Sequence, residues 1–297
     1  MAERCVRTDP LLVGGTGRSG STILGRFLGQ HPHLHLTNPE ELRFVANDHG
    51  VAEALAFAQM KWPRNRGAKD RAADAAGRCS DEWFYRDANT GLHTSMTLAQ
   101  MKAATQGYLN GFGTDALAAT QNFVDTVMSF VLATSQGRRW IDGSPANARV
   151  TDWLQPIWPQ CQVIAIIRDG RDVAASFVQQ DFGPDDIFDA LEQWFTRMKR
   201  MHTAVQRCTP GRILTIDMMD FVVHDRAGTV NAVCEFAGLA ADEQWLAWFD
   251  EHVTADAAHI GRWRSQFDQQ TLYRLDARYA QMCIELRTSG YIVPKDQ

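Results

Sequence analysis

The chain has 297 residues, of which 45% are hydrophobic and 22% charged, a balance that is typical of globular proteins and excludes wholesale disorder. It carries 30 Lys and Arg against 35 Asp and Glu, a formal charge of −5, which argues against a basic protein that coats nucleic acid. No apolar stretch is long enough to cross a bilayer, and the first residues lack the apolar core of a signal peptide. Six widely spaced cysteines without a C-x-x-C pair fit reduced thiols. We therefore expect a cytoplasmic protein with no membrane span and no nucleic-acid partner, whose oligomeric state the sequence leaves open.

Short apolar runs predict five strands. The runs are Leu11–Val13, Leu34–Leu36, Trp140–Ile141, Val163–Ile167 and Ile213–Ile216. Runs that are apolar at every position are typical of strands covered on both faces. Helical periodicity extends over Asp115–Thr134, Asp186–Gln206 and Gln269–Leu286. The alternation predicts a single α/β domain over residues 1–297, with a doubly wound parallel sheet and helices on both faces. Residues 46–138 show little strand pattern and are predicted to be a helical insertion.

The first predicted strand runs into a glycine-rich loop, Gly14 to Thr22, and a helix that we expect to begin near Ser21. Glycines allow positive φ angles, so that successive backbone N–H groups can surround an anion, and the helix N-terminus adds a partial positive charge. Gly15 and Gly20 have the spacing of a Walker A loop, but Ser21 stands where the Walker lysine should be. Arg18 instead places a cation inside the loop. A simple turn is the alternative, but an anion site is the better interpretation.

At this loop the chain resembles the sulfotransferases that use 3′-phosphoadenosine 5′-phosphosulfate (PAPS). Their 5′-phosphosulfate loop reads Pro-Lys/Arg-Ser-Gly-Thr-Thr, which the run from Gly17 to Thr22 matches with glycine for proline and serine for threonine. The arginine form, and the His31-Pro32 that follows, are similar to the tyrosylprotein and bacterial branches of the family. The resemblance implies a fold of the P-loop NTPase type. It also implies that the cofactor is bound by Gly17, Arg18, Ser19, Gly20, Ser21 and Thr22.

A second strand-turn-helix motif, Arg168 to Ser176, follows the fourth predicted strand. An arginine at the carboxyl end of a parallel strand lies where open α/β sheets bind ligands. We expect Asp172 to cap the helix. A structural cluster of ion pairs is the alternative for Arg171 and the neighbouring aspartates, but it leaves Arg168 and Ser176 unexplained. The motif resembles the 3′-phosphate site of the same family, which implies that Arg168 and Ser176 bind the 3′-phosphate of PAPS.

Near the C-terminus, Gly261-Arg262-Trp263 resembles the segment that covers the cofactor in this family. The resemblance implies that Arg262 reaches the 3′-phosphate and that Trp263 packs the segment down. The exposed start of an amphipathic helix is the alternative. The Arg-Lys-Gly of cytosolic steroid and phenol sulfotransferases is absent, because residues 256–258 are Asp-Ala-Ala.

Sulfuryl transfer requires a base for the proton of the acceptor and a cation for the leaving phosphate. Glu40-Glu41-Leu42-Arg43 resembles the Glu-Glu-Thr-Arg of tyrosylprotein sulfotransferases, which implies that Glu41 is the catalytic base. The first turn of a helix after Pro39 is a second interpretation that is compatible with the first. Some relatives have a leaving-group lysine where this chain has Gly143, so Arg18 is expected to be catalytic as well as cofactor-binding.

His31, His33 and His35 alternate along the chain but have no acidic partner at ligand spacing, so we predict polar surface and no metal site.

The family resemblance implies that PAPS is the co-substrate, that 3′-phosphoadenosine 5′-phosphate (PAP) is the product, and that no metal is required. The acceptor is expected to be a small molecule that is sulfated on a hydroxyl, with an amine as the alternative, and bound by the insertion over residues 46–138. Two alternatives stay open. One is a P-loop kinase-like phosphotransferase, which the missing Walker lysine disfavours. The other is a non-catalytic nucleotide-binding protein of the same fold, which Glu41 and Arg18 disfavour.

Overall fold

The computed structural model describes residues 9–60 and 67–295. Five parallel strands form one sheet in the order β2-β3-β1-β4-β5. They are β1 (Leu11–Gly15), β2 (Leu34–Leu36), β3 (Arg139–Asp142), β4 (Gln162–Ile167) and β5 (Ile213–Asp217). All five predicted strands are present, and none is more than two residues longer than the apolar run that predicted it. The carboxyl ends of β1 and β4, which are neighbours, carry the two motifs found in the sequence.

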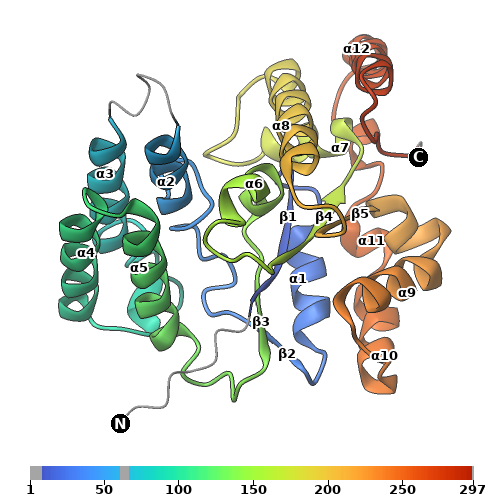
Figure 1. Ribbon diagram of the computed structural model, residues 1–297. Helices are drawn as coiled ribbons and strands as arrows, with labels where there is room; N and C mark the ends of the chain where they lie inside the picture. Colours follow the sequence, from blue (N-terminus) through green and yellow to red (C-terminus); the bar gives the residue numbers. More distant parts are fainter. Residues whose placement is uncertain (1–8, 61–66, 296–297) are drawn as a thin grey trace.

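Side chains of each strand alternate between two hydrophobic cores, one on each face of the sheet. Leu12 of β1 belongs to one core, and Leu11 and Val13 belong to the other. Helices of the first face are α6 (Thr151–Leu154), α7 (Gly170–Phe177), α8 (Ile187–Arg207) and α12 (Gln269–Thr288). Helices of the second face are α1 (Ser21–Gly29), α9 (Arg226–Ala237) and α10 (Glu243–His252). Figure 1 shows both sets around the sheet, which confirms the predicted α/β fold with helices on both faces.

Helices stand beside the sheet in the segment between β2 and β3, at the left of Figure 1. They are α2 (Val51–Gln59), α3 (Ala68–Ser80), η2 (Leu92–Thr94), α4 (Leu98–Phe112) and α5 (Ala116–Val131). Thr97 begins α4 with a capping box that includes Gln100, and Asp115 caps α5 by accepting from the N–H of Ala118. Stacked rings of Tyr108 and Phe123, with centroids 5.1 Å apart, hold α4 against α5.

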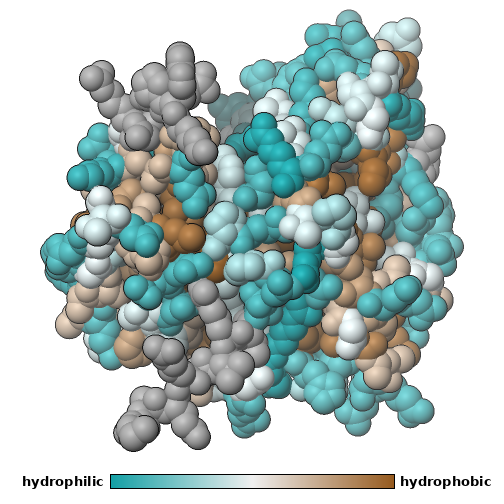
Figure 2. Space-filling view, in the orientation of Figure 1, coloured by the Kyte–Doolittle hydropathy of each residue, from teal (hydrophilic) through white to brown (hydrophobic). Residues whose placement is uncertain are grey.

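Two short 3₁₀ helices lie between the longer elements. They are η3 (Pro145–Arg149) after β3 and η5 (Arg262–Ser265), which follows α11 (Ala255–Ala258). An irregular turn, η4 (Asp220–His224), follows β5. Within the two described ranges, no helix is both long and apolar enough to cross a membrane. Figure 2 shows hydrophobic side chains in separate patches among hydrophilic ones on the face in view.

The prediction that the three histidines form polar surface is wrong for His31. Its side chain is 1% exposed, its Nε2 lies 3.0 Å from the carbonyl oxygen of Ala240, and its ring meets Trp245 edge-on. β2 begins only at Leu34, so a tight turn before the strand carries His31 into the core under α10. Among the residues that the structure describes, no group of three or more His, Cys, Asp or Glu side chains is arranged to hold a metal ion.

Candidate active site

The loop between β1 and α1 is held in a left-handed conformation at three residues. The φ angles are 82° at Gly17, 55° at Arg18 and 106° at Gly20. Gly20 caps α1 without a side-chain hydrogen bond, so the first N–H groups of the helix face the loop. Ser19 is buried, and its Oγ has no hydrogen-bond partner in the described part of the chain. A loop of this shape, with an unpartnered buried hydroxyl, fits an anion.

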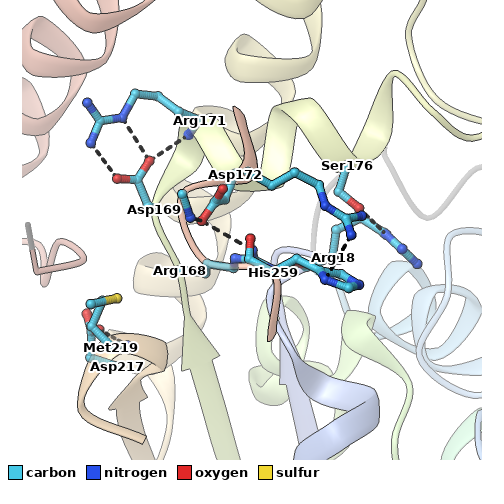
Figure 3. A network of polar contacts seen from close by, with 11 residues as sticks. Arg18, Arg168, Asp169, Arg171, Asp172, Ser176, Asp217, Met219 and His259 are labelled. Atoms are coloured by element: carbon cyan, nitrogen blue, oxygen red, sulfur yellow. Dashed lines mark hydrogen bonds and ion pairs between the residues drawn. The ribbon is translucent and has the colours of Figure 1, made fainter. Parts of the chain in front are cut away.

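Arg168 follows β4 and is 8% exposed. Its guanidinium pairs with Asp172 (Nη2 to Oδ2, 3.2 Å) and donates to the carbonyl oxygens of His259 (2.9 Å) and Arg18 (3.4 Å). Figure 3 shows Arg168 between these groups. The Nε of Arg168 is buried and has no partner within residues 9–60 and 67–295. The arginine is therefore fixed in place and keeps donors for a ligand.

The prediction that Asp172 caps α7 is wrong. Asp169 occupies the cap and accepts from the N–H of Arg171 at 2.8 Å, because α7 begins at Gly170. Asp172 lies in the first turn of the helix, where its Oδ2 also accepts from the N–H of Gly261 at 3.0 Å. Arg171 points away from the loop and pairs with Asp169 (2.6 Å), as Figure 3 shows. The ion-pair alternative therefore describes Arg171.

The two sequence motifs meet in one contact. The Nε of Arg18 donates to the Oγ of Ser176 at 2.9 Å, across 158 positions of sequence (Figure 3). Arg262 lies nearby on the C-terminal side, where its Nη2 is 3.0 Å from the Nδ1 of His259. The next residue, Trp263, is 3% exposed and packs under the guanidinium of Arg171 at 4.4 Å. Both motifs and Arg262 line a single cavity of about 660 Å³.

Glu41 lines the same cavity and is paired with Arg43, whose Nε and Nη2 donate to Oε2 at 3.0 and 2.8 Å. Neither bond uses Oε1. Glu40 points elsewhere, toward Arg26 of α1 (3.0 Å). The expected first turn of a helix after Pro39 is absent, since residues 37–43 have no helical conformation.

A buried carboxylate replaces the helix as the support of this segment. Asp142, at the end of β3, accepts from the N–H of Leu42 at 2.9 Å and from the N–H and hydroxyl of Ser144. Asn147 donates to its second oxygen at 2.9 Å. Burial raises the pKa of Asp142, and these hydrogen bonds oppose the rise. They hold the Glu41 segment against the end of β3.

A model of the sulfotransferase family matches residues 10–243, which include the loop, Glu41 and the motif from Arg168 to Ser176. The chain belongs to the sulfotransferase family. Among solved structures, the sulfotransferase domain of the Synechococcus PCC 7002 olefin synthase is 18% identical, with a TM-score of 0.56 and coverage of 99% of this chain and 100% of that one. Sulfotransferase STF1 of Mycobacterium tuberculosis is 15% identical, with a TM-score of 0.51 and coverage of 93% and 78%. At these identities the likeness shows the fold. A search of curated protein sequences found no significant relative.

In this sulfotransferase, Gly143 stands where some relatives have a leaving-group lysine. Its N–H donates to the carbonyl oxygen of Glu40 at 2.8 Å, and a Cβ at this position would lie 3.0 Å from the same oxygen. That is closer than most real Cβ contacts, so the backbone of Glu40 would have to move to admit a side chain. The backbone of Glu40 therefore packs closely against Gly143 and leaves no room there for a lysine side chain without a backbone shift.

Four further arginines line the cavity of the sulfotransferase and were not predicted as site residues. They are Arg43, Arg86, Arg149 and Arg197. The sequence pattern could have indicated Arg197, because it lies three residues after Trp194 and four before Met201 and therefore on the buried face of α8, where an arginine is unusual. Arg86 and Arg149 had none, because only the folded chain brings the insertion and η3 to the same cavity.

Proposed function

We propose that this sulfotransferase transfers the sulfuryl group of PAPS to a hydroxyl, with an amine as the alternative, of a small-molecule acceptor and releases PAP. The observation that carries the proposal is the contact between Arg18 and Ser176 inside one cavity. It joins the residues that the family resemblance assigns to the two ends of PAPS. Glu41 lines the cavity as well, so a base is available beside both.

The cofactor would be held at two places. The N–H groups of the loop from Gly17 to Thr22 are suited to the 5′-phosphosulfate. Arg168, Ser176 and Arg262 are suited to the 3′-phosphate. An unpartnered buried atom supports the second assignment, because Arg168 Nε has bonding capacity that no residue of the described chain uses. Ser19 is fully buried and is not among the residues that line the cavity.

Glu41 and Arg18 would carry the chemistry. Glu41 Oε1 accepts the proton of the acceptor hydroxyl, while Arg43 holds the other oxygen of the carboxylate. Arg18 stabilises the negative charge that grows on the leaving phosphate as the S–O bond breaks. A sulfuryl group carries less negative charge than a terminal phosphoryl group, so the arginines suffice in this proposal and no metal is invoked.

Calorimetric titration of the full chain with PAP, compared with ATP plus Mg²⁺, tests the nucleotide. We expect PAP to bind and to raise the melting temperature, since a ligand bound only by the folded state stabilises it. Release of PAP from PAPS is then followed with a panel of hydroxylated and amino acceptors. Binding of ATP plus Mg²⁺ without PAP would favour a phosphotransferase. Tight PAP binding without turnover on any acceptor would favour a non-catalytic protein.

A further inference from the structure

The cavity contains more positive charge than the cofactor residues account for. Among the residues that the structure describes, seven arginines line it, against the carboxylates of Glu41 and Asp172. Arg18, Arg168 and Arg262 belong to the proposed cofactor site, and Arg43 is paired with Glu41. Three arginines are left over, namely Arg86, Arg149 and Arg197.

Arg149 is a half-buried residue at the end of η3. Its Nε is buried without a hydrogen-bond partner in the described ranges. Burial and the nearby charge of Arg197 lower the pKa of Arg149 to about 10, so the side chain is still protonated at neutral pH. The charge of Asp48 acts on Arg149, but this carboxylate is exposed and its ion pair is with Arg200 at 3.6 Å.

Arg197 lies on α8 and lines the same cavity as Arg149. Its Nη1 donates to the carbonyl oxygen of Thr16 at 2.8 Å, and its guanidinium lies over the ring of Phe177 at 4.8 Å. Burial also lowers the pKa of Arg197. Arg86, from the insertion, lines the cavity near Glu41 and interacts with the charges of Glu41 and Arg43.

Like charges that are brought together and partly desolvated destabilise a protein unless an opposite charge joins them. We propose that Arg149 and Arg197, with Arg86 beside Glu41, form an anion subsite for the acceptor, which carries a carboxylate or a phosphate or sulfate ester besides the hydroxyl that is sulfated. The anion fixes the acceptor at one end, so that its hydroxyl lies at Glu41. That the anion belongs to an acceptor rests on the proposed function. Binding of an anion at the subsite can be measured without turnover.

Inorganic phosphate is the first probe. It is titrated calorimetrically into the full chain saturated with PAP, whose two phosphates fill the proposed cofactor positions. We expect one phosphate to bind and Arg149→Gln to weaken its Kd roughly tenfold or more, the loss typical of a charge-assisted hydrogen bond. Arg207→Gln is the matched control, because Arg207 lies at the end of α8 outside the cavity and pairs with Asp152, and it should change the Kd less than about twofold. No phosphate binding, or no effect of Arg149→Gln, would overturn the inference.

Two comparisons separate the acceptor subsite from the cofactor site. Phosphate should still bind when PAPS replaces PAP, and PAP affinity should be unchanged in Arg149→Gln. Loss of phosphate binding in the presence of PAPS would assign these arginines to the sulfuryl group and overturn the inference. If PAP itself failed to bind, the proposed function would fall. Titration of the unliganded protein with inorganic phosphate would then test whether the subsite exists. Arg149→Gln and Arg168→Gln are expected to remove different phosphate sites.

Acceptor preference and stability provide independent evidence. In pairs of a hydroxy acid and its neutral amide, the acid should have at least a tenfold higher kcat/KM, and Arg149→Gln should abolish the difference. A preference for the amide would contradict the subsite. Arg149→Gln should also raise the melting temperature of the unliganded protein, because it removes a partly desolvated charge that lies near the charge of Arg197 and whose Nε has no hydrogen-bond partner among the described residues. A lower melting temperature with unchanged phosphate affinity would instead make Arg149 a structural residue.

Discussion

Glu40 and Glu41 are neighbours in the chain but have different surroundings. Glu41 lines the cavity with Oε1 unused by Arg43, whereas Glu40 pairs with Arg26. We expect Glu41→Gln to lower turnover roughly 10²–10⁴-fold with nearly unchanged PAP affinity, because the amide keeps the shape but cannot accept the proton. Glu40→Gln is the control and should be mild. Single-turnover sulfuryl transfer measures both, and a crippled Glu40→Gln enzyme would reject Glu41 as the base.

Arg18 is exposed and holds Ser176 through its Nε, which leaves its two terminal nitrogens for the leaving phosphate. Arg18→Ala should depress kcat more than PAP affinity, since charge on the bridging oxygen develops mainly in the transition state. The control is Arg26→Ala, which removes an exposed arginine outside the cavity. Steady-state kinetics and PAP calorimetry on the same variants make the comparison. Equal losses in rate and affinity would count against a leaving-group role.

Ser176 and Arg168 are proposed to recognise one phosphate of the cofactor. Ser176→Ala and Arg168→Gln should each weaken PAP binding roughly tenfold or more, the usual cost of a lost hydrogen bond to a charged group. Adenosine 5′-phosphosulfate, which lacks the 3′-phosphate, should bind both variants as it binds the unmodified protein. Calorimetry with the two nucleotides gives the ratio. A similar loss for both nucleotides would show that these residues do not read the 3′-phosphate.

At the scale of elements, the packing of α7 on α8 depends on a glycine. A Cβ at Gly170 would lie 2.6 Å from the indole of Trp194, which is fully buried. Gly170→Ala should therefore destabilise the protein by about 1–3 kcal/mol, as overpacking of a core does. Gly77→Ala is the matched control in α3, with no atom within 4 Å of its Cβ, and should stabilise by about 0.5–1 kcal/mol. Urea denaturation checks both changes, and a neutral Gly170→Ala would mean that the helices separate at little cost.

The elements were predictable where one local rule determined them. The apolar run of β4 became a strand because strands buried on both faces need no alternation, and Gly17 and Gly20 of the loop adopt the positive φ angles that glycine permits. The segment of Glu41 was not predictable in this way. Pro39-Glu40-Glu41 favours a helix start locally. Asp142, a hundred positions away, accepts a hydrogen bond from the backbone N–H of Leu42 and holds the segment in a non-helical conformation.

Over the whole molecule, the sequence predicted which elements form but not which side chains meet. The order β2-β3-β1-β4-β5 places the loop after β1 beside the turn after β4, so Arg18 and Ser176 come together as the family pattern implies. Arg86 and Arg149 reach the same cavity from the insertion and from η3, and no spacing rule connects them. Their role as a binding surface depends on tertiary structure alone.

A cavity rich in arginine within a chain of net charge −5 has a consequence for the speed of capture. An anionic nucleotide is repelled by the body of the protein at long range and attracted by the cavity at short range. The Debye length is about 30 Å at 0.01 M salt and about 8 Å at 0.15 M, so added salt first screens the repulsion. In stopped-flow mixing, the association rate constant of PAP should stay level or rise up to about 0.1 M salt and fall only beyond it. A steep fall from the lowest salt onward would show that the cavity dominates the far field, as in proteins that steer their ligands from a distance.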